Sequence, residues 1–150
     1  MVLSACSTVD CPVQNTVSTQ YNIVDVDGAA LKTADTLWVW TPRSDGSDTL
    51  LLNRGIGISA FSLPVSYQHP EDTLVFFVAD TLGQMTIDTV WVKKDDIPHF
   101  ESVDCSAHFF HRLTAVRSSH NGIDTIYINE PSVTYDQTAV HFCIRFKARQ

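Results

Sequence analysis

The sequence VHFCIRF at residues 140–146 carries the clearest structural signal in this chain. Its even-numbered residues are all apolar, and His141, Cys143 and Arg145 stand between them. Because successive side chains of a strand point to opposite faces, the apolar residues share one face and the other three residues share the opposite face. The segment is therefore predicted to be a half-buried β-strand.

Other segments show similar patterns. The sequences TLWVW (36–40) and IDTVWV (87–92) also alternate with period two, and the apolar run LVFFVA (74–79) predicts a strand buried on both faces. We expect strands near 17–26, 35–41, 48–53, 57–63, 73–79, 86–93, 103–117 (one strand or two), 123–129 and 138–147. Short strands without any helical pattern predict an all-β fold. We expect a single antiparallel β-sandwich, Ig-like or prealbumin-like, of about eight or nine strands.

Turn residues mark the strand boundaries. The stretch 95–98 predicts a break, and Asn121-Gly122 predicts a type I′ hairpin, whose two central residues need positive φ. An Asp-Thr pair followed by an aliphatic residue begins at positions 35, 48, 72, 80, 88 and 124. We interpret it as a strand entrance, since aspartate caps turn N–H groups and threonine favours strands. A set of calcium-binding aspartates is the alternative.

The segment Leu3-Ser4-Ala5-Cys6 has the form of a lipobox, with small residues directly before a cysteine that would carry lipid through its sulfur. The alternative is an accidental match in a cytosolic protein. A complete signal peptide also has a charged start and an apolar run, which are lacking here, so we expect the native start to lie upstream of Met1. The predicted domains are a signal-peptide remnant (1–5), a lipidated tether (6–15) and a β-sandwich (16–150).

The bulk composition limits the partners of the domain. Of its 150 residues, 44% are hydrophobic and 18% are charged, which is typical of a folded protein, and the net charge of −7 argues against nucleic acid. No stretch approaches the ~20 apolar residues of a membrane span, so fatty acyl chains such as palmitate on Cys6 would be the membrane contact. Because Ser7 follows Cys6 and no acidic pair succeeds it, we expect outer-membrane anchoring with a periplasm-facing domain.

The chain has four cysteines, at positions 6, 11, 105 and 143. If Cys6 carries lipid, three remain, and they allow at most one internal disulfide. We favour a Cys11–Cys105 bridge, because it would join the tether to the body of the domain. The alternative is that all three are reduced and buried. The redox state of Cys143 stays open.

Aromatic residues offer the strongest indication of ligand binding. Trp38, Trp40, Trp91 and Tyr127 could form a platform for a glycan or a peptide if their face is exposed. Large aromatic residues more often contribute to cores, and we expect Trp38 and Trp40 to be buried. Period two cannot by itself assign which face is the inner one.

A metal site has weaker support. Cys105, His108 and His111 are spaced three apart, which aligns them on a helix but places neighbours on opposite faces of a strand. A zinc ion would also need His99 or His120 as a further ligand. Since no catalytic motif is present, we predict no cofactor and no enzymatic activity.

A resemblance to a known family rests on the order of several motifs. They are the lipobox cysteine, CP (11–12), DTLWV (35–39), DTLL (48–51), SLP (62–64), DTV (88–90), ESVDC (101–105), DTI (124–126) and a final aliphatic-aromatic strand. In this order they resemble an uncharacterised Bacteroidetes lipoprotein family, domain-of-unknown-function family 6452. The resemblance implies a β-rich domain without an established activity and two recurring cysteines at Cys11 and Cys105, in support of the bridge. Ser106 departs from the glycine usual there, and Cys143 has no counterpart.

Three functions follow from these observations. The first is a structural or accessory protein-interaction module, with an outer-membrane β-barrel protein as one candidate partner. The second is a glycan- or peptide-binding module that uses Trp38, Trp40 or Trp91. The third, which we weigh least, is a metal-dependent enzyme built on His108 and His111.

Overall fold

A computed structural model describes residues 17–42, 46, 48–66, 69–99 and 108–147, and no side-chain position is described for His99 or His108. The described residues form ten strands and no helix. The strands are β1 (Ser18–Ile23), β2 (Thr36–Pro42), β3 (Asp48–Ile56), β4 (Ala60–Pro64), β5 (Glu71–Ala79), β6 (Met85–His99), β7 (His108–Ser118), β8 (Ile123–Ile128), β9 (Ser132–Val133) and β10 (Phe142–Phe146). None of the described segments is a helix long and apolar enough to cross a membrane.

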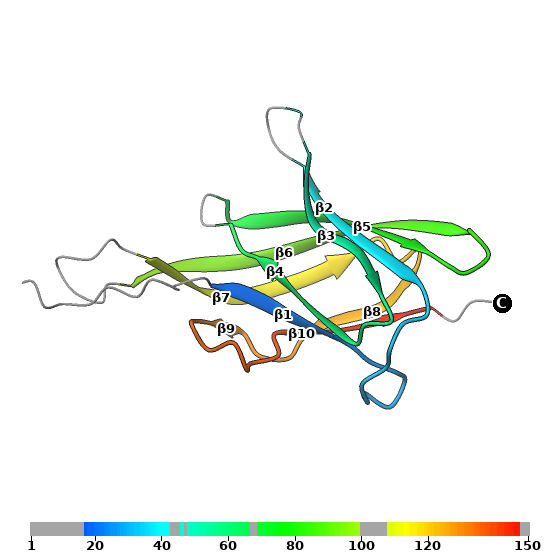
Figure 1. Ribbon diagram of the computed structural model, residues 1–150. Helices are drawn as coiled ribbons and strands as arrows, with labels where there is room; N and C mark the ends of the chain where they lie inside the picture. Colours follow the sequence, from blue (N-terminus) through cyan, green and yellow to red (C-terminus); the bar gives the residue numbers. More distant parts are fainter. Residues whose placement is uncertain (1–16, 43–45, 47, 67–68, 100–107, 148–150) are drawn as a thin grey trace, which may run out of the picture.

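The strands form two sheets that pack face to face. One sheet has four strands in the order β4-β1-β10-β8, and the other has six in the order β3-β2-β5-β6-β7-β9. Figure 1 shows β2, β5 and β6 in one layer and β1, β10 and β8 in the other. All the strand pairs are antiparallel except β1 and β10, which run parallel. The prediction of an all-β sandwich is confirmed, with one strand more than the upper expectation.

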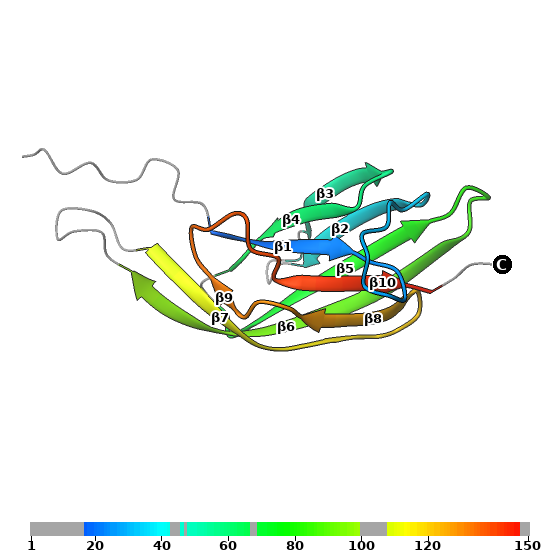
Figure 2. The same ribbon diagram turned by 90° about the horizontal axis from the view of Figure 1, so that it is seen from below.

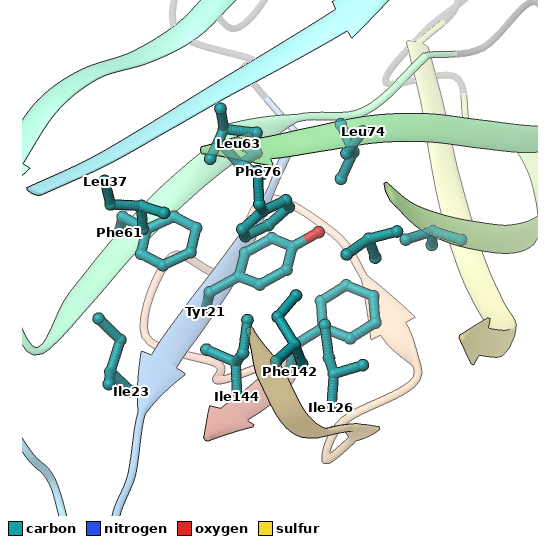
Figure 3. Packing of buried hydrophobic residues seen from close by; sticks show 14 of the residues in the cluster. Tyr21, Ile23, Leu37, Phe61, Leu63, Leu74, Phe76, Ile126, Phe142 and Ile144 are labelled. Atoms are coloured by element: carbon teal, nitrogen blue, oxygen red, sulfur yellow. The ribbon is translucent and has the colours of Figure 1, made fainter. Parts of the chain in front are cut away.

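Apolar side chains from both sheets fill the space between them. At its centre the Tyr21 ring stacks on Phe61 at 4.9 Å and on Phe142 at 4.7 Å between ring centroids, and Phe76 of the other sheet lies against it at 6.4 Å (Figure 3). Burial of the Tyr21 hydroxyl raises its pKa above the ordinary tyrosine range. This aromatic contact joins the sheets, since β1, β4 and β10 belong to one and β5 to the other.

The alternation at 142–146 is confirmed, with one exception just before it. Phe142 and Ile144 are fully buried, whereas Arg145 lies on the outer face of the four-stranded sheet. His141 was predicted to share the outer face with Cys143 and Arg145, but it is 1% exposed. The reason is that β10 begins only at Phe142, so the strand alternation does not extend to His141.

The apolar run of β5 is a strand, but it is not equally buried on both faces. Leu74, Phe76 and Val78 enter the core, while Val75 and Phe77 are only half-buried on the other side. No element of the described chain covers that outer side. The expectation of burial on both faces is therefore wrong.

Two strand boundaries differ from the predictions. The expected break at 95–98 is absent, because β6 continues to His99 and pairs with β7 from Val90 to His99. A register shift between Lys93 and Lys94 instead produces a bulge. The short strand β9 had no clear sequence signal and pairs with β7 at His111 and Arg112.

The predicted hairpin at Asn121-Gly122 does not form. The strands on either side, β7 and β8, belong to different sheets, so this segment is a crossover. Neither Asn121 nor Gly122 has positive φ, whereas His120 does, at 62°. A Cβ atom at position 122 would collide with the Thr86 side chain, so this glycine allows a close approach of two chain segments.

Asp88 holds this crossover in place. Asp88 is 1% exposed, and its carboxylate accepts hydrogen bonds from the backbone N–H groups of Asn121 (2.6 Å), Gly122 (2.7 Å) and Ile123 (2.8 Å) and from the Ser119 hydroxyl (2.7 Å). Burial alone would raise the pKa of this carboxyl, but the four hydrogen bonds lower it below the usual value. Asp88 thereby links β6 of one sheet to the beginning of β8 in the other.

The Asp-Thr pairs serve several purposes. The strand-entrance interpretation is confirmed at Asp35 and Asp48, which stand directly before β2 and at the start of β3. It is wrong at Asp88, inside β6, and at Asp80, which follows β5 and caps the next turn by accepting the N–H groups of Leu82 and Gln84. Asp80 and Asp88 both accept backbone N–H groups, Asp80 within its own turn and Asp88 from a segment more than thirty residues further along the chain.

Candidate functional site

The two tryptophans of β2 lie on the outside of the sandwich. Leu37 and Val39 enter the core, so Trp38 and Trp40 project from the opposite face and are half-buried. Our expectation that both tryptophans contribute to the core is therefore wrong. The alternation in TLWVW was real, but the aliphatic side chains took the inner face.

These tryptophans belong to a continuous apolar surface, which we call the aromatic face. In register across the sheet, Trp38 stands opposite Phe77, Phe77 opposite Ile87, and Trp40 between Leu50 and Val75. Several members are well exposed: Met85 by 52%, Ile87 by 47% and Leu50 by 37%. The aromatic face comprises Trp38, Trp40, Leu50, Val75, Phe77, Met85 and Ile87. In soluble proteins, continuous exposed apolar patches are typical of interaction sites.

A groove of about 460 Å³ runs over the aromatic face. The described residues that line it are Trp38, Trp40, Pro42, Asp48, Val75, Phe77 and Met85. Asp48 is the only one of these with an ionisable side chain, and it lies at the end of the groove next to Pro42, its partner in register. We call this the outer groove.

Trp91 lies on the same side of the six-stranded sheet, on β6, and is half-buried. The Arg117 guanidinium of β7 sits 3.9 Å from the centre of its ring, in a cation–π contact. One side of the indole is therefore already covered by Arg117. Trp91 and this arginine lie at the border of the aromatic face, where the apolar surface ends at a positive charge. Of the three candidate tryptophans, the sheet brings Trp38 and Trp40 together in one groove and leaves Trp91 outside its lining.

The outer face of the four-stranded sheet has a different character, and we call it the polar face. Across its strands lie Ser62, Gln20, Asn22, Cys143, Tyr127, Thr125 and Arg145. The Ser62 hydroxyl donates to the Gln20 side chain, and Arg145 Nε donates to the Asp124 carboxylate at 2.7 Å. Tyr127 is 44% exposed and is the only large aromatic side chain of this face among the described residues.

The histidine pair proposed for metal binding lies on a strand, β7, as the sequence predicted. His111 is 3% exposed, and its Nδ1–H donates to Asp96 Oδ1 at 2.7 Å. The side chain of His108 lies outside the described residues. In the described part of the chain, no group of three or more His, Cys, Asp or Glu side chains could hold a metal ion.

His111 instead belongs to a buried polar cluster between the two sheets. The Lys94 ammonium is almost inaccessible and donates to Asp96 Oδ1 at 3.1 Å and to the His69 carbonyl at 2.6 Å. Burial lowers the pKa of His111, although its contact with Asp96 acts in the opposite direction. Burial raises the pKa of Asp72, against the attraction of Lys94. Because these groups bind one another inside the sandwich, the cluster has the character of a structural network.

His141 is also buried, and its two ring nitrogens tie three strands together. Nδ1 accepts the Gln20 N–H of β1 at 2.9 Å, and Nε2–H donates to the Ser132 carbonyl of β9 at 3.1 Å. A ring with one accepting nitrogen is neutral. Burial accordingly lowers the pKa of His141. Its position next to β10 makes it a structural residue that nothing in the sequence marked out.

The described part of the chain contains one of the four cysteines, Cys143. It is a free thiol, 9% exposed, beside Tyr127 on the polar face. Cys6, the predicted lipidation site, lies outside the described residues, as do Cys11 and Cys105 of the predicted disulfide. The tether at 6–15 and the beginning of the predicted domain at residue 16 also lie outside them.

Comparison with known proteins places the chain in a family defined by sequence. Residues 36–146 match a family of unknown function, DUF6452, and the chain belongs to this family. The match extends from β2 to β10 and thus includes both the aromatic face and Asp88. No curated protein and no solved structure matched the chain.

Proposed function

We propose that this protein is an accessory protein-interaction module that binds a partner through the aromatic face. The observation that carries the proposal is the contrast between the two outer faces of one sandwich. Trp38, Trp40 and Phe77 project outward from the six-stranded sheet, while the corresponding face of the other sheet is polar. Contact between water and the uncovered parts of these rings costs free energy, and aromatic side chains are the residues in which interface binding energy concentrates.

The lining of the outer groove favours a protein partner over a glycan. A sugar ring that stacks on tryptophan also needs hydrogen bonds to its hydroxyl groups, and among the described residues Asp48 is the only charged side chain in the lining. Apolar partner side chains need no such bonds. The glycan- or peptide-binding alternative keeps its support from the exposure of Trp38 and Trp40, and a peptide fits the groove better than a glycan does.

Photocrosslinking in the native cells tests this proposal. The photoreactive residue p-benzoylphenylalanine at position 87 would report on the aromatic face, and the same residue at position 127 provides a matched control. Ile87 and Tyr127 are similarly exposed, at 47% and 44%, but lie on opposite faces. We expect a defined protein adduct from position 87 and none from position 127. The same adducts from both positions, or none from position 87, would contradict the proposed function.

We further propose that the module is a Bacteroidetes lipoprotein, anchored to the outer membrane through acyl chains on Cys6 and facing the periplasm. The lipobox and the order of the family motifs support this address. An outer-membrane β-barrel protein is then a natural partner class. Labelling of the full precursor with an alkyne fatty acid should modify the wild type and not Cys6→Ser. A wild-type protein that remains unlabelled and soluble would exclude the anchor.

Catalysis is not part of this proposal. The titratable groups that lie close together, Lys94, Asp96 and His111, bond to one another in the interior and are remote from the outer groove. The purified protein should therefore bind its partner without consuming a substrate. Bound zinc, copper or iron in elemental analysis of the full chain would revive the third hypothesis.

A further inference from the structure

The edge strand β3 separates two grooves, one on each of its sides. β3 pairs with β2 and is the terminal strand of the six-stranded sheet. Its outward residue Asp48 lines the outer groove, and Leu50 lies on the same side of the strand, opposite Trp40. Its inward residues Thr49 and Leu51 line a second groove of about 300 Å³, together with Val65 and Asp72. We call this second groove the inner groove.

The inner groove lies where the two sheets end side by side. β3 and β4 are the edge strands of their respective sheets and lie at the same margin of the sandwich (Figure 2). An edge strand presents backbone N–H and C=O groups that no neighbouring strand of its sheet has paired. A segment that added to β3 would place alternate side chains over the outer groove and into the inner groove, because strand side chains alternate between faces.

The charged residues at this margin of the sandwich favour a particular charge at one end of such a segment. Asp48 lies in the outer groove and Asp72 in the inner groove, both beside the first residues of β3. Among the described residues near Asp72 there are a second carboxylate, Asp96, and one ammonium, Lys94, so carboxylates outnumber ammonium groups there. At the other end of β3 stands Arg54. A partner with a basic residue beside Asp48 is therefore favoured.

The length of the site is limited by the shape of β3. Pairing with β2 is regular from Asp48 to Leu50, and the register shifts between Trp40 and Val39. Arg54 has a positive φ of 55°, which also bends the strand. A partner segment therefore has room for only a few residues beside β3.

We propose that the partner binds as a short extended segment that adds to the free edge of β3, with apolar residues at alternate positions and a lysine or arginine near Asp48. This inference deepens the proposed function and rests on it. The binding mode is strand addition, in which main-chain hydrogen bonds supply affinity. Specificity then comes from the two grooves, which receive alternate side chains of the segment.

The experiment uses a displayed library of random nonapeptides selected on the full chain. We expect enriched peptides with alternating apolar residues and a basic residue at one end. Methylation of single amide nitrogens in a synthetic copy should weaken binding at least about tenfold at every second position and leave the positions between within about twofold, because only alternate N–H groups of an added strand face β3. Hydrogen exchange should slow in residues 48–52 and not in β8, the edge of the other sheet.

Variants then distinguish the inference from the proposed function. Trp40→Ala should weaken the peptide about tenfold, and Asp48→Asn should weaken it about threefold and reduce its salt dependence. A peptide that depends on Trp40 but leaves the β3 amides unprotected, or shows no alternation on N-methylation, would overturn strand addition and retain the aromatic face. Protection of β3 without any dependence on Trp40 would retain strand addition and remove the aromatic face from the proposed function. Failure to enrich any peptide would overturn strand addition.

Discussion

The two outer faces of this sandwich are built from the same kind of strand but differ in what they present to water. On the six-stranded sheet, Trp38, Phe77 and Ile87 stand side by side across three strands. On the four-stranded sheet, Gln20, Asn22 and Arg145 occupy the corresponding outward positions. A sheet needs only one apolar face to build a core, so the second apolar face is not required for folding. The requirements of the core therefore do not account for the aromatic face, which is why we propose it as the binding surface.

The largest difference in stability is expected between two neighbouring residues of β5, one in the core and one on the aromatic face. Phe76 is fully buried, whereas its neighbour Phe77 lies half-buried on the aromatic face. We expect Phe76→Ala to lower the free energy of unfolding by about 3–5 kcal/mol, because it leaves a cavity in the core. Phe77→Ala should cost less, about 1–2 kcal/mol, since its ring is only partly buried and its removal leaves no enclosed cavity. Urea unfolding would measure both.

Equal losses for these two variants would contradict a binding role for the aromatic face. They would mean that Phe77 stabilises the fold as much as a core residue does. In the photocrosslinking experiment, Phe77→Ala should abolish the adduct from position 87 although the protein stays folded.

The packing of the two sheets, and with it the position of the two outer faces, depends on the crossover that Asp88 binds. Asp88→Ala would leave three backbone N–H groups near Gly122 without their acceptor, and we expect a loss of about 3–4 kcal/mol. Asp80→Ala is the matched control, because Asp80 also accepts two backbone N–H groups but at an exposed turn. It should cost less than about 1 kcal/mol. Thermal unfolding that shifts equally in both variants would exclude a special role for the buried carboxylate.

The stability of the protein should depend on pH through His141, which is bonded to the four-stranded sheet. Its pKa is lowered in the folded state, so the unfolded chain takes up protons more readily below about pH 6.5. The stability that this neutral ring provides is complete above that pH and is lost as the pH falls. We expect the free energy of unfolding to drop by about 1–2 kcal/mol between pH 7.5 and pH 5.5, with His111 contributing in the same direction.

A substitution of His141 distinguishes its contribution to the pH dependence from that of His111. His141→Asn keeps an oxygen acceptor for the Gln20 N–H but cannot titrate, so it should remove about half of the drop. Urea unfolding at several pH values gives the measurement. An unchanged pH dependence in this variant would assign the effect to His111 or to other groups.

The smallest effect is expected on the polar face. Arg145 and Asp124 form a surface ion pair in which both side chains remain partly exposed. Arg145→Ala should change the free energy of unfolding by less than about 1 kcal/mol, and even less in high salt. It should leave the crosslink from position 87 unchanged. A loss of that crosslink would show that the polar face participates in binding after all.

Much of the architecture could be predicted from residue patterns. Each of the nine expected strand regions overlaps one strand of the structure, and only β9 was not expected, because period-two alternation and turn residues are local properties. Asp95–Pro98 misled the prediction, since pairing with β7 carries β6 through residues that usually break strands. The site was only half predictable: Trp38 and Trp40 were singled out, but Asp48, Leu50 and Met85 join them only through neighbours on other strands.

Alternation of side chains was sufficient to establish that this chain forms strands, that they are many and short, and that a two-layer β structure follows. Which of two alternating faces points inward is not a local property, because it depends on the partner sheet against which a strand packs. Tertiary structure alone placed Leu37 and Val39 inside and the tryptophans between them outside. It also turned Asn121-Gly122 from a hairpin into a crossover, since a buried carboxylate from β6 could satisfy three backbone N–H groups at once.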